Sequence, residues 1–209
     1  MTQSITLDLV KGNEAPKKLS LDLVKDESFK VRLSWDGNSD LDLHVLACHN
    51  NGTSSTISAH ADILSTYNVE RVRGGQTVGT IKKSADGTFQ TLNGALVHSA
   101  DAIEGDTISG DDEWVKINPA LLPADKNEIP IIVMIHPQTP NKTFAGVKNA
   151  RVVIEDSSGN AVMDVSLSDQ FGAFNGVQMG SILIDSSIEF AAVGVGFNGD
   201  FNSVIAHFC

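Results

Sequence analysis

Short stretches of the chain alternate between apolar and polar residues, as a strand does when one of its faces is buried and the other meets water. This alternation covers Ile5–Val10, Leu19–Val24 and Phe29–Trp35. The pentapeptide Leu-Asp-Leu-Val-Lys occurs twice, at residues 7–11 and 21–25. We interpret the pair as two edge-type strands of similar facing, because a repeat architecture needs three or more units.

Other segments predict strands with different surroundings. Ile129–Ile135 is a continuous apolar run rich in β-branched residues, which is typical of a strand buried on both faces. Asp156–Asn160 carries turn residues between two apolar segments and predicts a hairpin. The strands of that hairpin are expected at Ala150–Glu155 and Ala161–Ser166, and two more strands at Glu189–Phe197 and Ser203–Phe208.

Helical signals are weak. One short turn is expected within Ala61–Tyr67, and another at Asn118–Leu122, where Pro119 suits a first helical position. Many short strands separated by turns predict an all-β fold, a β-sandwich of two antiparallel or mixed sheets. No linker-like stretch divides the 209 residues, so we expect a single domain over residues 1–209.

Composition narrows the cellular setting. Apolar residues make up 41% of the chain, enough for a sizeable core, and no apolar run approaches the length of a membrane span. The segment Met1–Ser4 does not begin a signal peptide, so we expect a soluble, cytoplasmic protein without direct membrane insertion. Cys48 and Cys209 are expected as two reduced thiols, and their pairing with each other stays open.

The distribution of charge says more than its total. A net charge of -11 argues against nucleic acid as a partner. Lys and Arg are missing from Leu33–Glu70 and from Ser84–Val115, although both windows are rich in carboxylates. Carboxylates packed together raise one another's pKa values, so such segments either project into water or hold a cation. Calcium is the usual cation for sites made only of oxygen ligands.

Two constellations concentrate this chemistry. Asp40 and Asp42 are two residues apart, so on a strand they point to the same side, with Leu41 and Leu43 facing the core. The second constellation follows His98 and lacks the spacing of an EF-hand. Its residues alone leave two interpretations open, a cation site or a solvated acidic loop. Its carboxylates are Asp101, Glu104, Asp106, Asp111, Asp112 and Glu113.

Other chemistries have weaker support. The six histidines are dispersed without the paired spacing of a zinc site, and neither a phosphate-binding loop nor a G-x-S-x-G elbow is present. A catalytic role for the pair Asp111 and Asp112 is less favoured than a role in holding a cation. We therefore expect a protein that is not an enzyme and has no evident small-molecule substrate.

Several of these motifs occur in an order that resembles the tellurium-resistance (TerD) family over nearly 200 residues. They include Leu33–Asp36, Asp40–Asp42, the acidic loop that closes in Gly110–Glu113, and the tail Phe190–Phe197. The resemblance implies a β-sandwich that binds Ca²⁺ and is linked to tellurite, phage and general stress resistance. It assigns the following residues to the metal or its neighbourhood: Asp40, Asp42, Asp62, Asn68, Asp101, Asp106, Asp111, Asp112 and Glu113.

The chain departs from the family pattern in two places. Residues 100–105 read Ala-Asp-Ala-Ile-Glu-Gly where the family usually has Gly-Asp-Asn-x-Thr-Gly, which removes two oxygen ligands and leaves Glu104 as their candidate replacement. Leu43 and His44 stand where the family favours small residues. We therefore predict that one of two expected calcium sites, chiefly that of the second loop, is weakened or absent.

Two functions from different classes follow, each with protein partners or self-association. The first is a calcium-binding sensor or scaffold of the stress and tellurite resistance type. The second is a structural or decoration subunit of a phage particle or another large assembly, which would place the protein in a virion. The alternation of basic blocks with acid-rich windows along the chain would suit contacts between such subunits.

Overall fold

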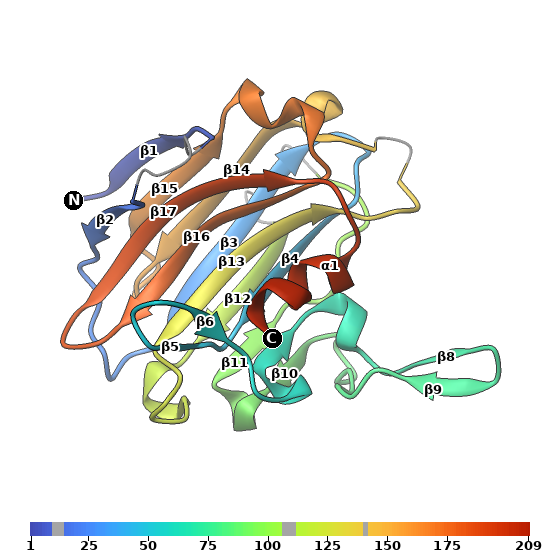
Figure 1. Cartoon of the computed structure of the whole chain (residues 1–209), viewed down its shortest axis with the longest axis horizontal. Helices are drawn as coiled ribbons and strands as arrows, with labels where there is room; N and C mark the ends of the chain where they lie inside the picture. The colour runs from blue at the N-terminus through green and yellow to red at the C-terminus, as the bar shows by residue number, and fades with distance from the viewer. Residues whose placement is uncertain (10–14, 106–111, 140–141) are drawn as a thin grey trace.

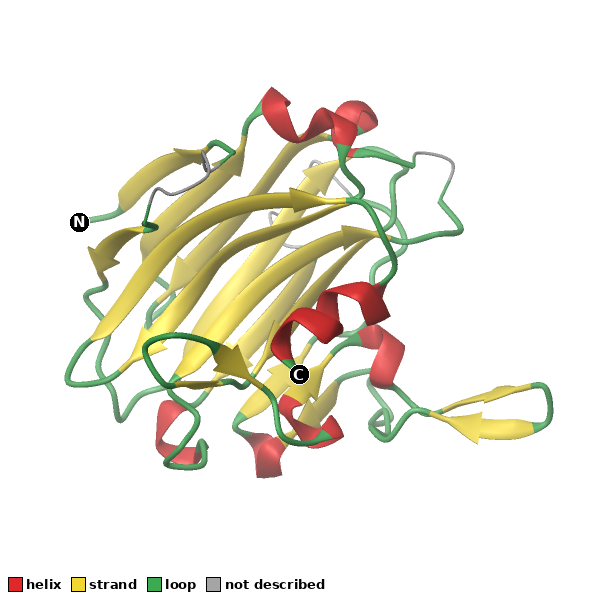
Figure 2. Ribbon diagram, viewed as in Figure 1, coloured by secondary structure: helices red, strands yellow, loops and turns green. Residues whose placement is uncertain are grey.

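The computed structural model describes residues 1–9, 15–105, 112–139 and 142–209. Two large sheets lie face to face, as Figures 1 and 2 show, and the all-β prediction is confirmed. Sheet I has seven strands in the order β1 (Gln3–Leu7), β15 (Ala161–Leu167), β14 (Lys148–Glu155), β3 (Phe29–Asp36), β12 (Glu113–Ile117), β11 (Leu96–His98) and β10 (Phe89–Thr91). Sheet II has six, in the order β2 (Lys17–Ser20), β17 (Ile188–Phe197), β16 (Gly176–Ile184), β13 (Glu128–Ile135), β4 (Leu41–Leu46) and β7 (Ile63–Leu64).

Sheet I is mixed and sheet II is antiparallel. In sheet I, β1 runs parallel to β15, and its other neighbouring pairs are antiparallel. β1 forms one edge of sheet I and β2 forms one edge of sheet II. The prediction that the two similar pentapeptides are themselves edge strands was wrong within the described residues: Leu7 is the last residue of β1, and residues 21–25 follow β2 without strand structure.

The core lies between the sheets and follows from the alternation along the strands. In β3, Phe29, Val31, Leu33 and Trp35 are buried, while the residues between them are partly exposed. Strand β13 is buried along its whole length because its two faces meet different apolar groups. Ile131 and its alternate neighbours face the core between the sheets, whereas Ile132 and Met134 pack under the C-terminal helix.

That helix, α1 (Phe201–Ile205), replaces the strand that we expected at Ser203–Phe208, so this prediction was wrong. The Asp200 carboxylate caps it by accepting a hydrogen bond from the backbone N–H of Ser203 at 2.9 Å. Phe201, Val204 and Phe208 follow a helical spacing and pack on the outer face of sheet II, across which α1 lies in Figure 1. The apolar spacing at intervals of three and four was the signal that a strand interpretation overlooked.

The remaining elements are short. The two expected turns are confirmed as 3₁₀ turns on either side of β7 and at Pro119, where Asn118 is the N-cap. The predicted hairpin joins β14 to β15 around Asp156–Asn160. Two small hairpins complete the fold, β5 (His49–Asn50) with β6 (Ser55–Thr56) and β8 (Arg71–Arg73) with β9 (Gln76–Val78). The 3₁₀ turns are η1 (His60–Asp62), η2 (Thr66–Asn68), η3 (Leu92–Gly94), η4 (Pro119–Leu121), η5 (Phe144–Gly146), η6 (Asp169–Ala173) and η7 (Ala206–Phe208).

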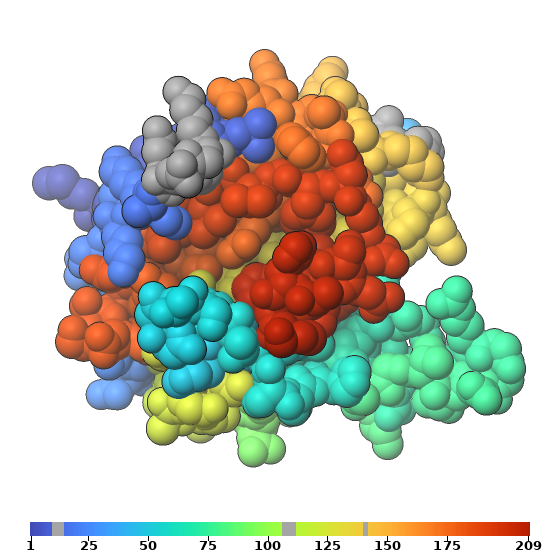
Figure 3. Space-filling model, viewed as in Figure 1, coloured from blue at the N-terminus to red at the C-terminus, as the bar shows by residue number. Residues whose placement is uncertain are grey.

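The β8–β9 hairpin stands out from the body of the molecule as an arm (Figures 1 and 3). Cys48 is buried and Cys209 is exposed, and both are free thiols. Among the described residues, the helices are too short and too polar to serve as a membrane span.

Candidate metal centre

Asp42 is held on β4 by the alternation of that strand. Leu41 and Leu43 are fully buried in the core, as expected, so Asp42 projects to the other face. There it is covered by η2, whose Thr66 hydroxyl donates a hydrogen bond to Oδ1 at 2.7 Å. The Tyr67 hydroxyl donates to Oδ2 at 3.3 Å. The carboxylate is therefore almost fully buried and held by two hydroxyl groups.

Glu113 reaches the same place from sheet I because the edge of β4 is incomplete. Strand β7 pairs with β4 only at Val45 and Leu46, which leaves the main chain of Leu43 without a strand partner on that side. Glu113 Oε2 accepts the Leu43 N–H at 2.7 Å, and His98 Nε2 lies 2.9 Å from the Leu43 carbonyl oxygen. Two side chains of sheet I thus satisfy a backbone unit of sheet II that would otherwise be buried unpaired.

Asp101 approaches from the loop that follows β11. The Glu113 Oε1 accepts a long hydrogen bond from the Ala102 N–H at 3.4 Å, which places this loop beside the carboxylate. Further along, Gly105 bridges to Gly37 and packs on Trp35, where an added Cβ would lie 2.4 Å from the indole Cδ1. A glycine is therefore required for the loop to lie this close to the end of β3.

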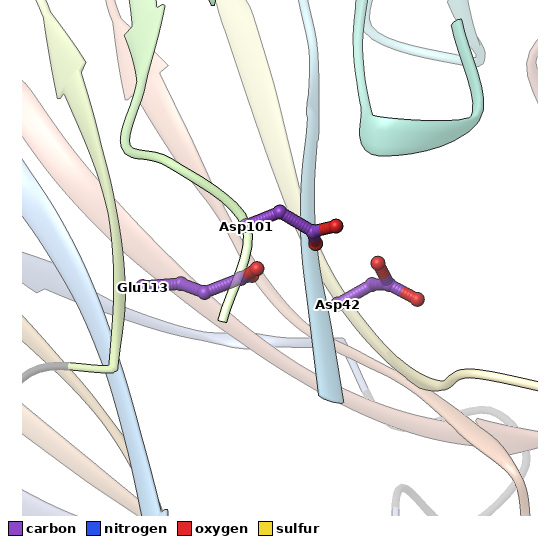
Figure 4. Close-up of side chains that lie close together, drawn as sticks. All are labelled: Asp42, Asp101 and Glu113. Atoms are coloured by element: carbon purple, nitrogen blue, oxygen red, sulfur yellow. The ribbon is translucent and has the colours of Figure 1, made fainter. Parts of the chain in front are cut away.

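The three carboxylates converge (Figure 4). One oxygen of each of Asp42, Asp101 and Glu113 lies within 4.8 Å of the others. Two oxygens that bind the same Ca²⁺ are at most about 5 Å apart, twice the usual calcium–oxygen distance. Asp42 and Glu113 are buried and Asp101 is exposed, so the cluster is closed on the protein side and open to solvent on the other. The residues present fit a calcium ion.

Burial makes this cluster electrostatically costly without a cation. The pKa of Asp42 is raised to about 6, chiefly by burial and to a smaller extent by the charge of Asp40, although the hydrogen bond from Thr66 opposes the rise. Burial followed by the charge of Asp42 raises the pKa of Glu113 well above its usual range. His98 Nε2 lies 3.8 Å from Glu113 Oε2. Because burial lowers the pKa of His98, the imidazole does not supply a full positive charge to offset that of the carboxylate.

Asp40 and Glu104 lie at the solvent side of the cluster. Both line a cleft of about 920 Å³ that Asp42 and Asp101 also line. The Asp40 backbone N–H donates to the Thr139 hydroxyl at 3.2 Å, and Asp40 Oδ2 lies 3.4 Å from His136 Nδ1. Burial raises the pKa of Asp40, although His136 opposes this effect. The two carboxylates supply additional oxygens at the mouth of the cluster.

Asp62 does not join this cluster, contrary to the sequence analysis. Its carboxylate forms a buried ion pair with Lys126, with Oδ2 and Nζ 2.8 Å apart, and accepts the backbone N–H groups of Ser58 and Ala59. Burial alone would raise the pKa of Asp62, but these hydrogen bonds outweigh it and lower the pKa. All of these contacts lie within 3.0 Å, so Asp62 serves to fix the loop before β7.

Asn68 is likewise used by the fold. Its amide donates to the carbonyl oxygens of His60 and Ile63 and accepts from the Thr80 hydroxyl, each at 3.0 Å. Asp112 accepts the Trp35 N–H at 2.9 Å, which fixes the start of β12 against β3. The structure does not bring Asn68 and Asp112 into the three-carboxylate cluster, and Asp106 and Asp111 lie outside the described residues.

Sequence reasoning missed the groups that surround the carboxylates. Thr66, Tyr67, Thr139 and His136 each contact Asp40 or Asp42, and none was assigned a role. Their positions follow from how η2 and the turn after β13 fold over β4. His44, two residues after Asp42 on β4, is buried with its ring against those of Tyr67 and Phe201, and burial is the main cause that lowers its pKa to about 3. No motif spacing in the sequence marks these contacts.

Comparison with known proteins identifies the family. The model of the TerD domain matches residues 86–208, more than half of the chain. The chain belongs to the TerD family. General stress protein 16U of Bacillus subtilis (strain 168) is 29% identical over 110 residues, which is 51% of this chain but only 56% of that protein. Tellurium resistance protein TerD of Alcaligenes sp is 27% identical over 137 residues, 62% of this chain and 71% of that protein.

Solved structures show the same fold across a longer part of this TerD-family chain. The crystal structure of SAV2460, a protein of unknown function, matches with a TM-score of 0.57 and 15% identity over 87% of this chain and 96% of that one. A homologue of telluride resistance protein (TerD) from Streptomyces coelicolor A3(2) matches with a TM-score of 0.54 and 19% identity, covering 86% and 95%. The family model includes Asp101 and Glu113, whereas Asp42 precedes the matched residues.

The raised pKa of Asp42 predicts an effect of pH on the metal-free protein. Its folded pKa of about 6 exceeds the ordinary 3.8, so stability from this group is present at low pH and lost as pH rises through 6. Relative to Asp42→Asn, the free energy of unfolding in EDTA should fall by roughly 2 to 3 kcal/mol between pH 4 and pH 8. Urea unfolding across this range measures the difference. Asp22→Asn, an exposed control, should follow the wild type, and an identical pH dependence in Asp42→Asn would contradict the assignment.

The ion pair of Asp62 predicts a structural phenotype. Lys126→Met leaves a buried carboxylate without its cation and should lower the free energy of unfolding by about 3 to 5 kcal/mol. Asp62→Asn should also destabilise, and equally with and without Ca²⁺, because Asp62 lies outside the cluster. Chemical unfolding in both conditions tests this, with the exposed Lys116→Met as the matched control. Loss of a calcium response in Asp62→Asn would show instead that this residue belongs to the metal site.

Proposed function

We propose that this TerD-family chain is a non-enzymatic calcium-binding protein of the stress and tellurium resistance type. The observation that supports it is the convergence of Asp42, Asp101 and Glu113, each with an oxygen within 4.8 Å of the others. Asp40 and Glu104 line the open side and would complete an oxygen-rich coordination sphere together with water. A divalent cation bound by the three carboxylates would offset their negative charge and so remove their mutual repulsion.

The cation would act by joining segments that are far apart in sequence. Asp42 lies on β4 of sheet II, Glu113 on β12 of sheet I, and Asp101 in the loop after β11. Without a cation, the three charges favour separation of this loop from the two sheets. With a cation, the loop is held against them, so the metal controls the order of a surface that a protein partner can recognise. This is the proposed sensor or scaffold mechanism.

The relatives support the biological setting. One is called a general stress protein and the other a tellurium resistance protein. We assign this chain to the same kind of response and place it in the cytoplasm. No thiol lies in the carboxylate cluster, so the proposal involves oxygen ligands alone and no tellurium chemistry.

Calcium should stabilise the folded protein. A ligand present at a hundredfold excess over its Kd adds about 2.7 kcal/mol, which for a chain of this size raises Tm by about 5 to 10 °C. Thermal unfolding in EDTA, in Ca²⁺ and in Mg²⁺ measures the shift. Asp42→Asn and Glu113→Gln keep the shape of each side chain but should lose the shift, while Asp22→Asn should keep it. An unchanged Tm of the wild type in millimolar Ca²⁺ would refute the proposal.

The β8–β9 arm favours a second candidate, a subunit of a larger assembly. Its two strands pair with each other in a separate two-stranded sheet, and Val72 at its surface is 76% exposed. A two-stranded hairpin is marginally stable alone in water, and its open edges can pair with another chain. A repeated contact between copies would use these edges.

Sedimentation velocity over a range of protein concentrations tests this second candidate. The wild type should form species larger than one chain, and Val72→Asp should shift them toward the monomer because it places a charge on the apolar contact. Thr77→Asp, on the partner strand of the arm, should act in the same direction. A wild type that sediments as a monomer at every concentration would exclude the assembly role.

A further inference from the structure

A second cavity adjoins the acidic cleft beside the carboxylate cluster, and Tyr67, Arg71, Arg73, His136 and Pro137 line both. Its volume is about 970 Å³, and it is bordered by η2, the base of the β8–β9 arm, the end of β13 and the start of α1. Ile63, Met134 and Phe201 give it apolar walls. The arm and α1 border this region in Figure 3. A cavity of this size accommodates a small organic molecule.

The charge at its rim is opposite to that of the whole chain. Arg71, Arg73 and Lys142 line the cavity, against the single carboxylate of Asp200. That carboxylate is already used to cap α1 by accepting the Ser203 N–H. In a chain with a net charge of -11, three permanent cations around one cavity create a local positive potential. The rim therefore favours an anion.

The cations differ in how far they are committed to the fold. Arg71 donates to the carbonyl oxygens of Tyr67 and Val69, at 2.6 and 3.2 Å, so it braces η2. Lys142 donates to the Thr139 carbonyl oxygen at 2.8 Å. Arg73 is exposed on the arm, where it pairs with Gln76, and its guanidinium forms neither a hydrogen bond nor an ion pair with any part of the chain that the structure describes. Arg73 is thus available to a ligand without loss of an internal contact.

Aromatic rings also line the cavity beside these cations. The ring of Tyr67 stacks on His136 with centroids 5.9 Å apart and planes inclined by 15°. The Tyr67 ring also stacks on Phe201, with centroids 5.4 Å apart and planes inclined by 18°. A planar apolar group can pack against such rings, while the cations at the rim hold a charged group.

We propose that this cavity binds an amphipathic anion, with a planar apolar body against the Tyr67 and Phe201 rings and its anionic group at Arg73 and Lys142. Neither the carboxylate cluster nor the family motifs account for this combination of charge and apolar surface. The sequence carries no motif for such a ligand because the residues that line the cavity come from segments far apart in the chain, between His60 and Ile205.

The two sites share a wall, so they are coupled. Tyr67 donates its hydroxyl to Asp42 and His136 lies 3.4 Å from Asp40, while both residues also line the second cavity. This part of the inference rests on the proposed calcium site. A cation there removes negative charge close to the cavity, and the affinity for an anion rises as a result.

Titration with 8-anilinonaphthalene-1-sulfonate in EDTA tests the cavity without the metal. Its fluorescence should show saturable binding, and the uncharged N-phenyl-1-naphthylamine should bind more weakly. Arg73→Glu should weaken binding of the sulfonate by about fivefold or more, with little effect on the uncharged probe. Lys18→Glu, the same charge change on the exposed β2, should leave both affinities unchanged. Equal affinities of wild type and Arg73→Glu for the sulfonate would overturn the proposal.

The same titration in Ca²⁺ tests the coupling. The sulfonate should bind about fivefold more tightly than in EDTA, and Asp42→Asn should lose this gain. If Ca²⁺ raises Tm but leaves the sulfonate affinity unchanged, the coupling is wrong although the calcium site stands. If Ca²⁺ does not raise Tm, the calcium proposal fails, and the comparison of Arg73→Glu with wild type in EDTA still decides whether the anion site exists.

Discussion

Strand β4 pairs with β7 only at Val45 and Leu46, so the backbone N–H and C=O of Leu43 have no strand partner on that side. Leu43 is nevertheless fully buried where the two sheets meet. Side chains of sheet I pair with these two groups: Glu113 accepts the N–H and His98 lies against the carbonyl oxygen. A carboxylate is therefore fully buried for a reason of backbone hydrogen bonding, independent of any metal. Its burial beside Asp42 then generates the electrostatic problem that defines the candidate site. The incomplete edge of one strand thus gives rise to the cluster.

The buried carboxylates lower the stability of the metal-free fold, yet they are the groups that a cation would bind. The raised pKa values of Asp42 and Glu113 mean that the metal-free fold loses stability when these carboxylates ionise. An apolar residue at position 42 would avoid that cost but would also remove one of the two buried carboxylates of the cluster. A cation resolves the conflict because it needs the ionised forms that the empty site disfavours. The hydroxyls of Thr66 and Tyr67 keep the carboxylate of Asp42 oriented in either state.

Local patterns in the sequence predict most of the sandwich but only part of the site. Alternation in β3 and the continuous apolar run of β13 follow directly from how each strand is buried. The helix at Phe201–Ile205 was missed because the spacing of apolar residues in so short a segment fits a strand as well as a helix. The signal that favours the helix is its N-cap, Asp200. Asp62 was misplaced because its partner, Lys126, is 64 residues away, and no spacing reveals such a pair. Asp101 and Glu113 were predicted as acidic ligands, yet their meeting with Asp42 depends on the pairing of both sheets.

Tyr67 and His136 line both the acidic cleft of the carboxylate cluster and the cationic cavity, and Arg71 and Arg73 also line both. Tyr67 reaches Asp42 and His136 reaches Asp40, whereas the stack of Tyr67 on Phe201 lies toward the cavity. Charges in two adjoining sites interact because they lie close together, and the interaction is weaker where water reaches between them. Acidic residues repel an anion while the cluster is empty, and a bound cation reverses the sign of that contribution. The fold that buries Asp42 of β4 under η2 therefore also places Arg71 and Arg73, at the base of the β8–β9 arm, close to the cluster. A change of charge at the cluster would alter the electrostatic potential at these two side chains.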